Sequence, residues 1–276
     1  PISFELGKTL EGGAIGIVIK SKCPDFKEGD FVNSNFGWRE YFTAERKYLQ
    51  KVNPDIGPLQ AYLGTLGMPG MTAYVGLLRI GNLKEGDKVM ISAAAGAVGT
   101  VASQIAVAKG CEVFGTAGSD EKCSFLEKDL GLTKAINYKT CGHLIKSFHS
   151  ACPNGVDVYF ENVGGSHLEA ALSIMRPNGR IALCGMIEQY NDTAPRPGPN
   201  NLMAAIAKSL KIEGFIVSNH SDLSEKFLTD MKSWIDSGKM QWKETIDEGI
   251  ESAPGAFLKL FKGQNFGKML VKIADK

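Results

Sequence analysis

The spacing of apolar residues changes near residue 73, and the two patterns predict two kinds of structure. Before this point, short runs rich in β-branched or aromatic residues are separated by turn sequences. These runs predict strands at residues 14–20, 31–33 and 38–42, and no stretch there has the period of a helix. We therefore expect the first part of the chain to be β-rich.

From residue 73 onwards, strand-like runs alternate with segments that have helical spacing. In residues 98–109, for example, Val101, Ile105 and Ala108 share one face of a helix. This alternation predicts an α/β fold with a doubly wound parallel sheet. The predicted strands are residues 88–93, 112–117, 135–138, 156–163, 180–185 and 211–217, and the predicted helices are 98–109, 120–130, 143–151, 166–175, 202–209 and 223–237. The tail changes pattern again, with a short helix at 253–261 and a strand at 269–273.

Composition and charge exclude several function classes. The net charge is +1, so no strong field favours nucleic acid or an anionic membrane. No apolar run approaches the ~20 residues that span a bilayer. The six cysteines and four histidines form no pair or cluster with metal-ligand spacing, so we expect no bound metal. Scattered thiols of this kind fit the reducing cytoplasm.

A turn containing two glycines gives the strongest chemical signal. The segment Ala93–Gly99 follows a predicted strand and opens a predicted helix, as in the GxGxxG fingerprint of dinucleotide-binding proteins, with Ala94 in the first glycine position. Gly96 would let a pyrophosphate approach the backbone, and Gly99 would let the helix pack on the strand. The helix N-terminus would offer free N–H groups to the anion. The alternative is a tight turn that binds nothing.

The end of the next strand favours NADP over NAD. NAD-binding proteins place Asp or Glu there to hold the ribose 2′-hydroxyl, whereas this strand ends in Ala117, Gly118 and Ser119. Lys122 follows one helical turn later, and a cation beside small hydrogen-bond donors suits a 2′-phosphate. We therefore expect NADPH as the cofactor. The alternative role for Lys122 is to lie on a solvated helix face.

Further motifs occur in order along the chain: GMPGMTAY at 67–74, GSDEK at 118–122, NYK at 137–139, FENVGG at 160–165 and CG at 184–185. With the glycine turn, this series is similar to the zinc-independent medium-chain dehydrogenase/reductase superfamily. Within it, the chain resembles the branch of the prostaglandin reductases (leukotriene B4 12-hydroxydehydrogenases), alkenal double-bond reductases and curcumin reductases. The resemblance extends from about residue 5 to residue 273.

This resemblance implies two domains with the active site in the cleft between them. Residues 73–239 would form a Rossmann domain, and residues 1–72 with 240–276 would form the remainder of a GroES-like β domain. Members of the family carry a further N-terminal stretch before the segment that matches Pro1, and that stretch begins the substrate domain. The resemblance also implies a cytoplasmic homodimer.

The resemblance assigns roles to individual residues. Tyr190 would be the catalytic residue, because a tyrosine there donates a hydrogen bond to the substrate carbonyl as negative charge develops; its alternative role is an aromatic on a mobile loop. Lys122 and Tyr138 would bind the 2′-phosphate end, and Asn162 the ribose or pyrophosphate. The cofactor-binding positions are Thr72, Gly96, Ala97, Val98, Gly99, Ser119, Lys122, Tyr138, Asn162, Cys184, Gly185, Met186, Ile187, Tyr190, Phe215, Ile216, Val217 and Asn265. Their alternative roles are structural: a helix-start cap for Thr72, packing for Tyr138, a turn for Asn162 and core for Phe215.

The implied reaction is the NADPH-dependent reduction of a C=C bond conjugated to a carbonyl, in an alkenal, a 15-oxo-prostaglandin-like ketone or a curcumin-like enone. Hydride would pass from the nicotinamide to the β-carbon, and Tyr190 would hold the enolate until the α-carbon is protonated. Two alternatives stay open. A quinone reductase of the same superfamily would not depend on Tyr190, and a non-catalytic dinucleotide-binding protein would need only the glycine turn.

Overall fold

The computed structural model describes residues 5–274 and divides the chain into two compact units. One unit is Pro69–Trp242, and the other is formed by the described residues before and after it. The predicted boundaries at residues 73 and 239 differ from these by a few residues.

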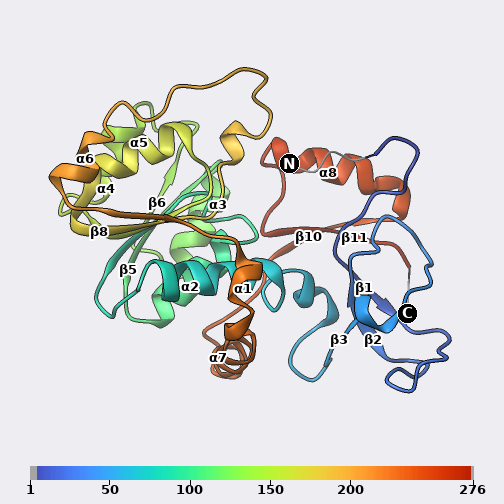
Figure 1. Ribbon diagram of the computed structural model, residues 1–276. Helices are drawn as coiled ribbons and strands as arrows, with labels where there is room; N and C mark the ends of the chain where they lie inside the picture. The colour runs from blue at the N-terminus through green and yellow to red at the C-terminus, as the bar shows by residue number, and fades with distance from the viewer. Residues whose placement is uncertain (1–4, 275–276) are drawn as a thin grey trace. The chain divides into compact units, whose positions relative to one another are not determined.

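A six-stranded parallel sheet forms the centre of the unit Pro69–Trp242 (Figure 1). Its strands are β4 (Lys88–Ile91), β5 (Glu112–Ala117), β6 (Lys134–Asn137), β7 (Val156–Glu161), β8 (Met175–Leu183) and β9 (Lys211–Gly214), in the order β6-β5-β4-β7-β8-β9. Every neighbouring pair is parallel, so the predicted doubly wound α/β fold is confirmed. The strand order reverses between β4 and β7, and open sheets of this kind bind ligands beyond the carboxyl ends of the strands at that point.

Helices cover both faces of this sheet. They are α2 (Gly99–Ala108), α3 (Asp120–Lys128), α4 (Leu144–Ala151), α5 (Gly165–Ile174) and α6 (Met203–Ala207). The helix α7 (Ser224–Asp236) packs instead against Tyr74, whose ring centroid lies 5.6 Å from that of Phe227. In Figure 1, α4, α5 and α6 gather on one face of the sheet and α2 lies on the other. The central strands are therefore buried on both sides, which explains why residues 89–91 of β4 and 158–160 of β7 are continuous apolar runs rather than alternating ones.

The first helical segment of this unit is absent from the sequence-based expectations. It consists of α1 (Met68–Tyr74) continued by a π-helical stretch, η3 (Val75–Ile80). Nearly all of its residues are buried, so it has no polar face to produce a helical period. Gly76 is required for close packing, because a Cβ there would lie 2.4 Å from the ring of Phe160 and 2.8 Å from that of Phe215.

One predicted strand is wrong, and another is shorter than predicted. Residues 38–42 form bends and irregular chain, and Trp38 has a φ of 65°, a left-handed conformation that ends any extended run. The strand predicted at 211–217 ends at Gly214, and a 3-10 stretch, η5 (Val217–Leu223), follows it. The other predicted strands and helices are present, with ends that shift by a few residues.

The second unit contains two small sheets. The strands β1 (Ala14–Ile17), β2 (Phe31–Ser34) and β3 (Gln50–Lys51) are antiparallel, and β10 (Glu244–Glu248) pairs in parallel with β11 (Lys268–Lys272). The helix α8 (Ala253–Phe261) connects the latter two strands. Short 3-10 turns, η1 (Arg46–Tyr48), η2 (Leu59–Leu63) and η6 (Ile250–Ser252), complete the unit. Across residues 5–274, no helix is both long enough and apolar enough to cross a bilayer.

Candidate active site

The glycine turn between β4 and α2 is fixed by close backbone packing. A Cβ on Gly99 would lie 2.2 Å from the carbonyl oxygen of Ala93, so only glycine fits, and the predicted packing role of Gly99 is confirmed. At Gly96, by contrast, only that same oxygen would lie within 4 Å of an added Cβ, at 3.2 Å. Gly96 therefore leaves open space beside the start of α2, where the Thr100 and Ala102 amides already bond the carbonyl oxygens of Gly96 and Val98. This geometry suits a pyrophosphate.

Strand β5 holds the start of the same turn in place. The Thr116 hydroxyl accepts a hydrogen bond from the Ala93 amide at 3.1 Å, and the Thr116 carbonyl accepts one from Ala94 at 2.8 Å. These bonds stabilise Ala93 in a left-handed conformation, with φ of 49°. The turn is thus shaped before any ligand arrives.

Ser92 links the carboxyl ends of β4 and β7, the two strands between which the strand order reverses. Its hydroxyl donates to the fully buried Glu161 carboxylate at 2.8 Å and accepts the Asn162 amide N–H at 2.7 Å. The Asn162 side chain donates in turn to the Ser92 carbonyl at 2.7 Å. Burial raises the pKa of Glu161. Asn162 is therefore held rigidly where the resemblance places a contact to ribose or pyrophosphate.

Polar side chains converge at the ends of β5 and β6, where a 2′-phosphate was expected. Ser119 caps α3 by accepting the Lys122 amide at 3.3 Å, so its hydroxyl lies at the start of that helix. Lys122 is half-buried, and burial together with the charge of Lys139 lowers its pKa. Tyr138 is 39% exposed, and burial raises its pKa. A Cβ on Gly118 would lie 3.0 Å from the Tyr138 hydroxyl, so a larger residue there would crowd the group.

Tyr190 lies beyond the carboxyl end of β8, after the 3-10 turn η4 (Ile187–Gln189). Its ring side chain is 63% exposed, yet its hydroxyl turns back to the strand end and accepts the Met186 N–H at 3.3 Å. A Cβ on Gly185 would lie 3.0 Å from the same hydroxyl. Because the hydroxyl accepts this bond from the backbone, its own proton is available to a substrate oxygen.

One arginine joins the chain on both sides of Tyr190. The Arg196 guanidinium bonds the Glu188 carboxylate at 2.7 Å and the Asp192 carboxylate at 2.8 Å. The Glu188 carboxylate also accepts the Ser166 hydroxyl at 3.4 Å, at the N-terminus of α5. These contacts tie the loop after β8 into a closed turn around Tyr190.

A hollow of about 660 Å³ lies at the carboxyl ends of β8 and β9. Five predicted positions line it: Cys184, Gly185, Met186, Phe215 and Ile216. Five further lining residues were not predicted from the sequence: Leu183, Glu213, Gly214, Asn219 and His220. Burial, with a smaller contribution from the charge of Glu161, raises the pKa of Cys184 to about 12. That thiol stays protonated at neutral pH, so it is a lining group and not a nucleophile.

Three further predicted residues, Thr72, Val217 and Asn265, have other surroundings in the structure. Thr72 is 7% exposed within α1, so its alternative role as a helix-start cap is wrong. Val217 begins η5 and does not line the hollow beside it. Asn265 belongs to the other unit, where its side-chain amide donates to the Gly267 carbonyl at 2.8 Å.

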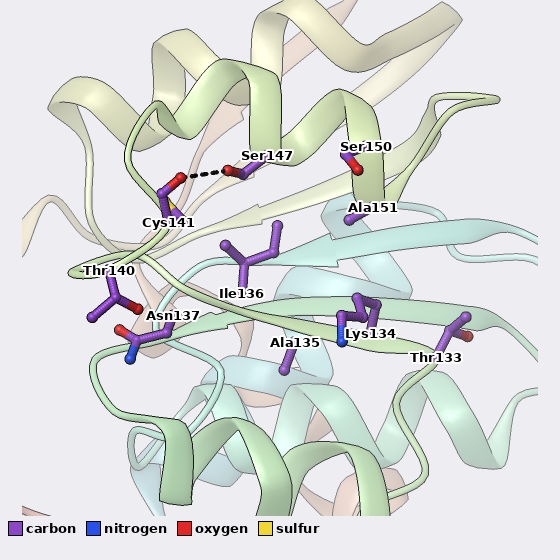
Figure 2. A pocket seen from close by; sticks show the side chains of 10 residues that line it. All are labelled: Thr133, Lys134, Ala135, Ile136, Asn137, Thr140, Cys141, Ser147, Ser150 and Ala151. Atoms are coloured by element: carbon purple, nitrogen blue, oxygen red, sulfur yellow. Dashed lines mark hydrogen bonds between the residues drawn. The ribbon is translucent and has the colours of Figure 1, made fainter.

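A second hollow, of about 550 Å³, runs along the edge strand β6 and beside α4 (Figure 2). Its lining carries hydroxyl groups such as that of Ser147, which donates to the Cys141 carbonyl at 3.2 Å. None of the predicted site residues lines it. Within residues 5–274, no three His, Cys, Asp or Glu side chains form a group that could hold a metal ion.

Comparison with known proteins agrees with this arrangement. The family model described as zinc-binding dehydrogenase matches residues 97–233, and that of the N-terminal domain of oxidoreductase matches residues 1–52. Prostaglandin reductase 1 of Mus musculus is 45% identical over 270 residues, 96% of this chain and 82% of its own length. The 2-alkenal reductase (NADP(+)-dependent) of Nicotiana tabacum is 41% identical over 99% of this chain and 79% of its own. CurA from Vibrio vulnificus, solved in complex with NADPH, superposes with a TM-score of 0.88 at 36% identity, covering 96% of this chain and 80% of its own.

Proposed function

This chain belongs to the medium-chain dehydrogenase/reductase superfamily, in the branch of the prostaglandin reductases and 2-alkenal reductases, and from that premise we propose its reaction and its active site. The protein reduces the C=C bond of α,β-unsaturated aldehydes and ketones with NADPH. The observation that carries the proposal is the Tyr190 hydroxyl, held by the Met186 amide at the end of β8 with its proton free to be donated. Cytoplasmic location and a homodimer remain part of this proposal.

The residues of the unit Pro69–Trp242 fit each part of NADPH. Gly96 leaves the space that a pyrophosphate needs, and the N-terminus of α2 supplies N–H donors. Lys122 and Tyr138 would hold the 2′-phosphate, and no acid at the end of β5 opposes it. Asn162 would meet the ribose, and the hollow lined by Cys184, Met186 and Phe215 would receive the nicotinamide.

The chemistry divides between cofactor and protein. When bound, NADPH supplies a hydride for the β-carbon of the substrate. Tyr190 donates its O–H hydrogen bond to the carbonyl oxygen, which becomes the enolate oxygen as the hydride arrives. The Met186 amide stabilises the partial negative charge that grows on the phenol oxygen during this donation. Protonation of the α-carbon from solvent completes the saturated aldehyde or ketone.

Steady-state NADPH oxidation with a 2-alkenal, a cyclic enone and a quinone tests this function, with NADH as the matched cofactor control. We expect turnover of the alkenal and the enone, a clear preference for NADPH, and a saturated carbonyl product by mass spectrometry. Turnover confined to the quinone would favour the quinone reductase alternative. Binding of NADPH with no turnover of any acceptor would favour the non-catalytic alternative.

A further inference from the structure

Lys139 lies over the same glycine as Tyr138, at the end of β6. A Cβ on Gly118 would lie 3.2 Å from Lys139 Cε and 3.0 Å from the Tyr138 hydroxyl. The far part of the Lys139 side chain and the Tyr138 hydroxyl therefore approach the end of β5 from the same side. Neither the glycine fingerprint nor the missing acid at the end of β5 pointed to Lys139.

Asn137 fixes the backbone that carries this lysine. Its side-chain oxygen accepts the Lys139 amide at 3.1 Å, and its side-chain nitrogen donates to the Asp120 carboxylate at 2.7 Å. Asn137 thus links the turn after β6 to the first turn of α3. The hydrogen bond from Asn137 occupies the Asp120 carboxylate. An unbonded carboxylate there would compete with a phosphate for Lys122 and Lys139.

The charges around this point favour an anion. Burial lowers the pKa of Lys122, and the positive charge of Lys139 lowers it further. Glu121, exposed on α3, opposes this effect only as the smallest of the three contributions. Two like charges held together repel each other, and a dianion placed between them removes that repulsion.

We propose that Lys139 is a second cation for the 2′-phosphate of NADPH and, with Lys122, determines the preference for NADPH over NADH. The proposal rests on the function proposed above and adds a specificity residue to it. A phosphate over Gly118 would bond the Tyr138 hydroxyl and lie between the two ammonium groups. Because Lys139 is exposed, its contribution weakens as salt rises.

Binding of 2′,5′-ADP and of 5′-AMP, measured by calorimetry on the whole chain, tests the role of Lys139 without turnover. Lys139→Ala should weaken 2′,5′-ADP about tenfold and leave 5′-AMP unchanged, because only the former carries a 2′-phosphate. Lys139→Arg should retain the preference, and Lys128→Ala, at the exposed end of α3, should change neither ligand.

Other results of these titrations would contradict either the role of Lys139 or the proposed cofactor. Unchanged 2′,5′-ADP affinity in Lys139→Ala, or equal weakening of both ligands, would overturn the role of Lys139. If the unaltered protein did not prefer 2′,5′-ADP to 5′-AMP, the proposed cofactor itself would be wrong. The two failures are therefore distinguishable from the same set of titrations.

Discussion

The two ends of the candidate site are built differently. At the phosphate end, the turn from β4 to α2 is close-packed backbone, where a Cβ on Gly99 would meet the Ala93 carbonyl oxygen at 2.2 Å. At the catalytic end, Tyr190 is 63% exposed on a loop held by ion pairs of Arg196. Pyrophosphate binding thus relies on backbone that side-chain changes hardly alter, whereas catalysis relies on a surface segment that single side chains position.

This difference predicts that mutations separate affinity from turnover according to the end at which they fall. Changes near β4, β5 and α3 should alter cofactor binding. Those that displace the backbone should also lower the free energy of unfolding. Changes near the loop after β8 should alter turnover while cofactor affinity stays constant.

Gly99→Ala should have the largest effect. The added Cβ must displace the backbone of Ala93, because no rotamer can relieve a contact made by a Cβ. We expect the free energy of unfolding to fall by about 3 kcal/mol and NADPH binding to be lost. Chemical denaturation and cofactor titration would measure both. The control is Gly255→Ala in α8, where an added Cβ meets nothing within 4 Å, and it should keep or raise stability.

Lys122→Ala should weaken NADPH roughly 10- to 150-fold and NADH far less. A hydrogen bond from an ammonium group to a phosphate is worth about 1.5–3 kcal/mol, and only NADPH presents a phosphate at this position. Fluorescence titration of both cofactors gives the ratio, with Lys128→Ala as the matched lysine control. An equal loss for NADPH and NADH would remove Lys122 from the 2′-phosphate site.

Tyr190→Phe should lower kcat on an enone about tenfold to a hundredfold and leave the affinity for NADPH unchanged. Loss of a donor to a developing oxyanion costs about 2.7–4 kcal/mol in buried sites, and the exposure of Tyr190 lets water replace part of it. A quinone, as a better hydride acceptor, should be affected less. Unchanged enone turnover would assign the hydrogen bond to another group.

Arg196→Ala should lower kcat on an enone about twofold to fivefold, since exposed ion pairs contribute little individually. The same substitution should add nothing in a Tyr190→Phe background, because the arginine acts through the tyrosine. Arg176→Ala is the matched control: Arg176 bonds the Asp157 carboxylate at the other end of β8. An additive effect of Arg196→Ala in the double variant would show that Arg196 does not position Tyr190.

The sequence predicts the parts of this molecule in which backbone geometry restricts the residue type. Gly99 is recognisable because no other residue fits, and the strands of the parallel sheet are recognisable because they are buried on both faces. The α1–η3 segment is not, since its burial on nearly all sides removes the helical period. The left-handed conformation of Trp38 could not be predicted, because residue type alone does not specify it.

The same contrast applies within the candidate site. The glycine turn, Lys122 and the residues after β8 follow from local motifs and from the resemblance. The position of His220 in the hollow does not, nor does the approach of Lys139, within the NYK motif, to Gly118, because both depend on contacts between segments that are separate in the sequence. A lysine or arginine in a loop becomes informative only when the structure shows which charges it meets.

The most direct test of the proposed reaction follows the transferred hydride. NADPH carrying deuterium at the transferred position of nicotinamide C4 should be oxidised with an enone, and the product analysed by NMR. We expect deuterium on the β-carbon of a saturated ketone, and an unlabelled α-carbon that takes its proton from solvent. Deuterium on the carbonyl carbon of an unsaturated alcohol, or no transfer at all, would contradict the assignment as a double-bond reductase.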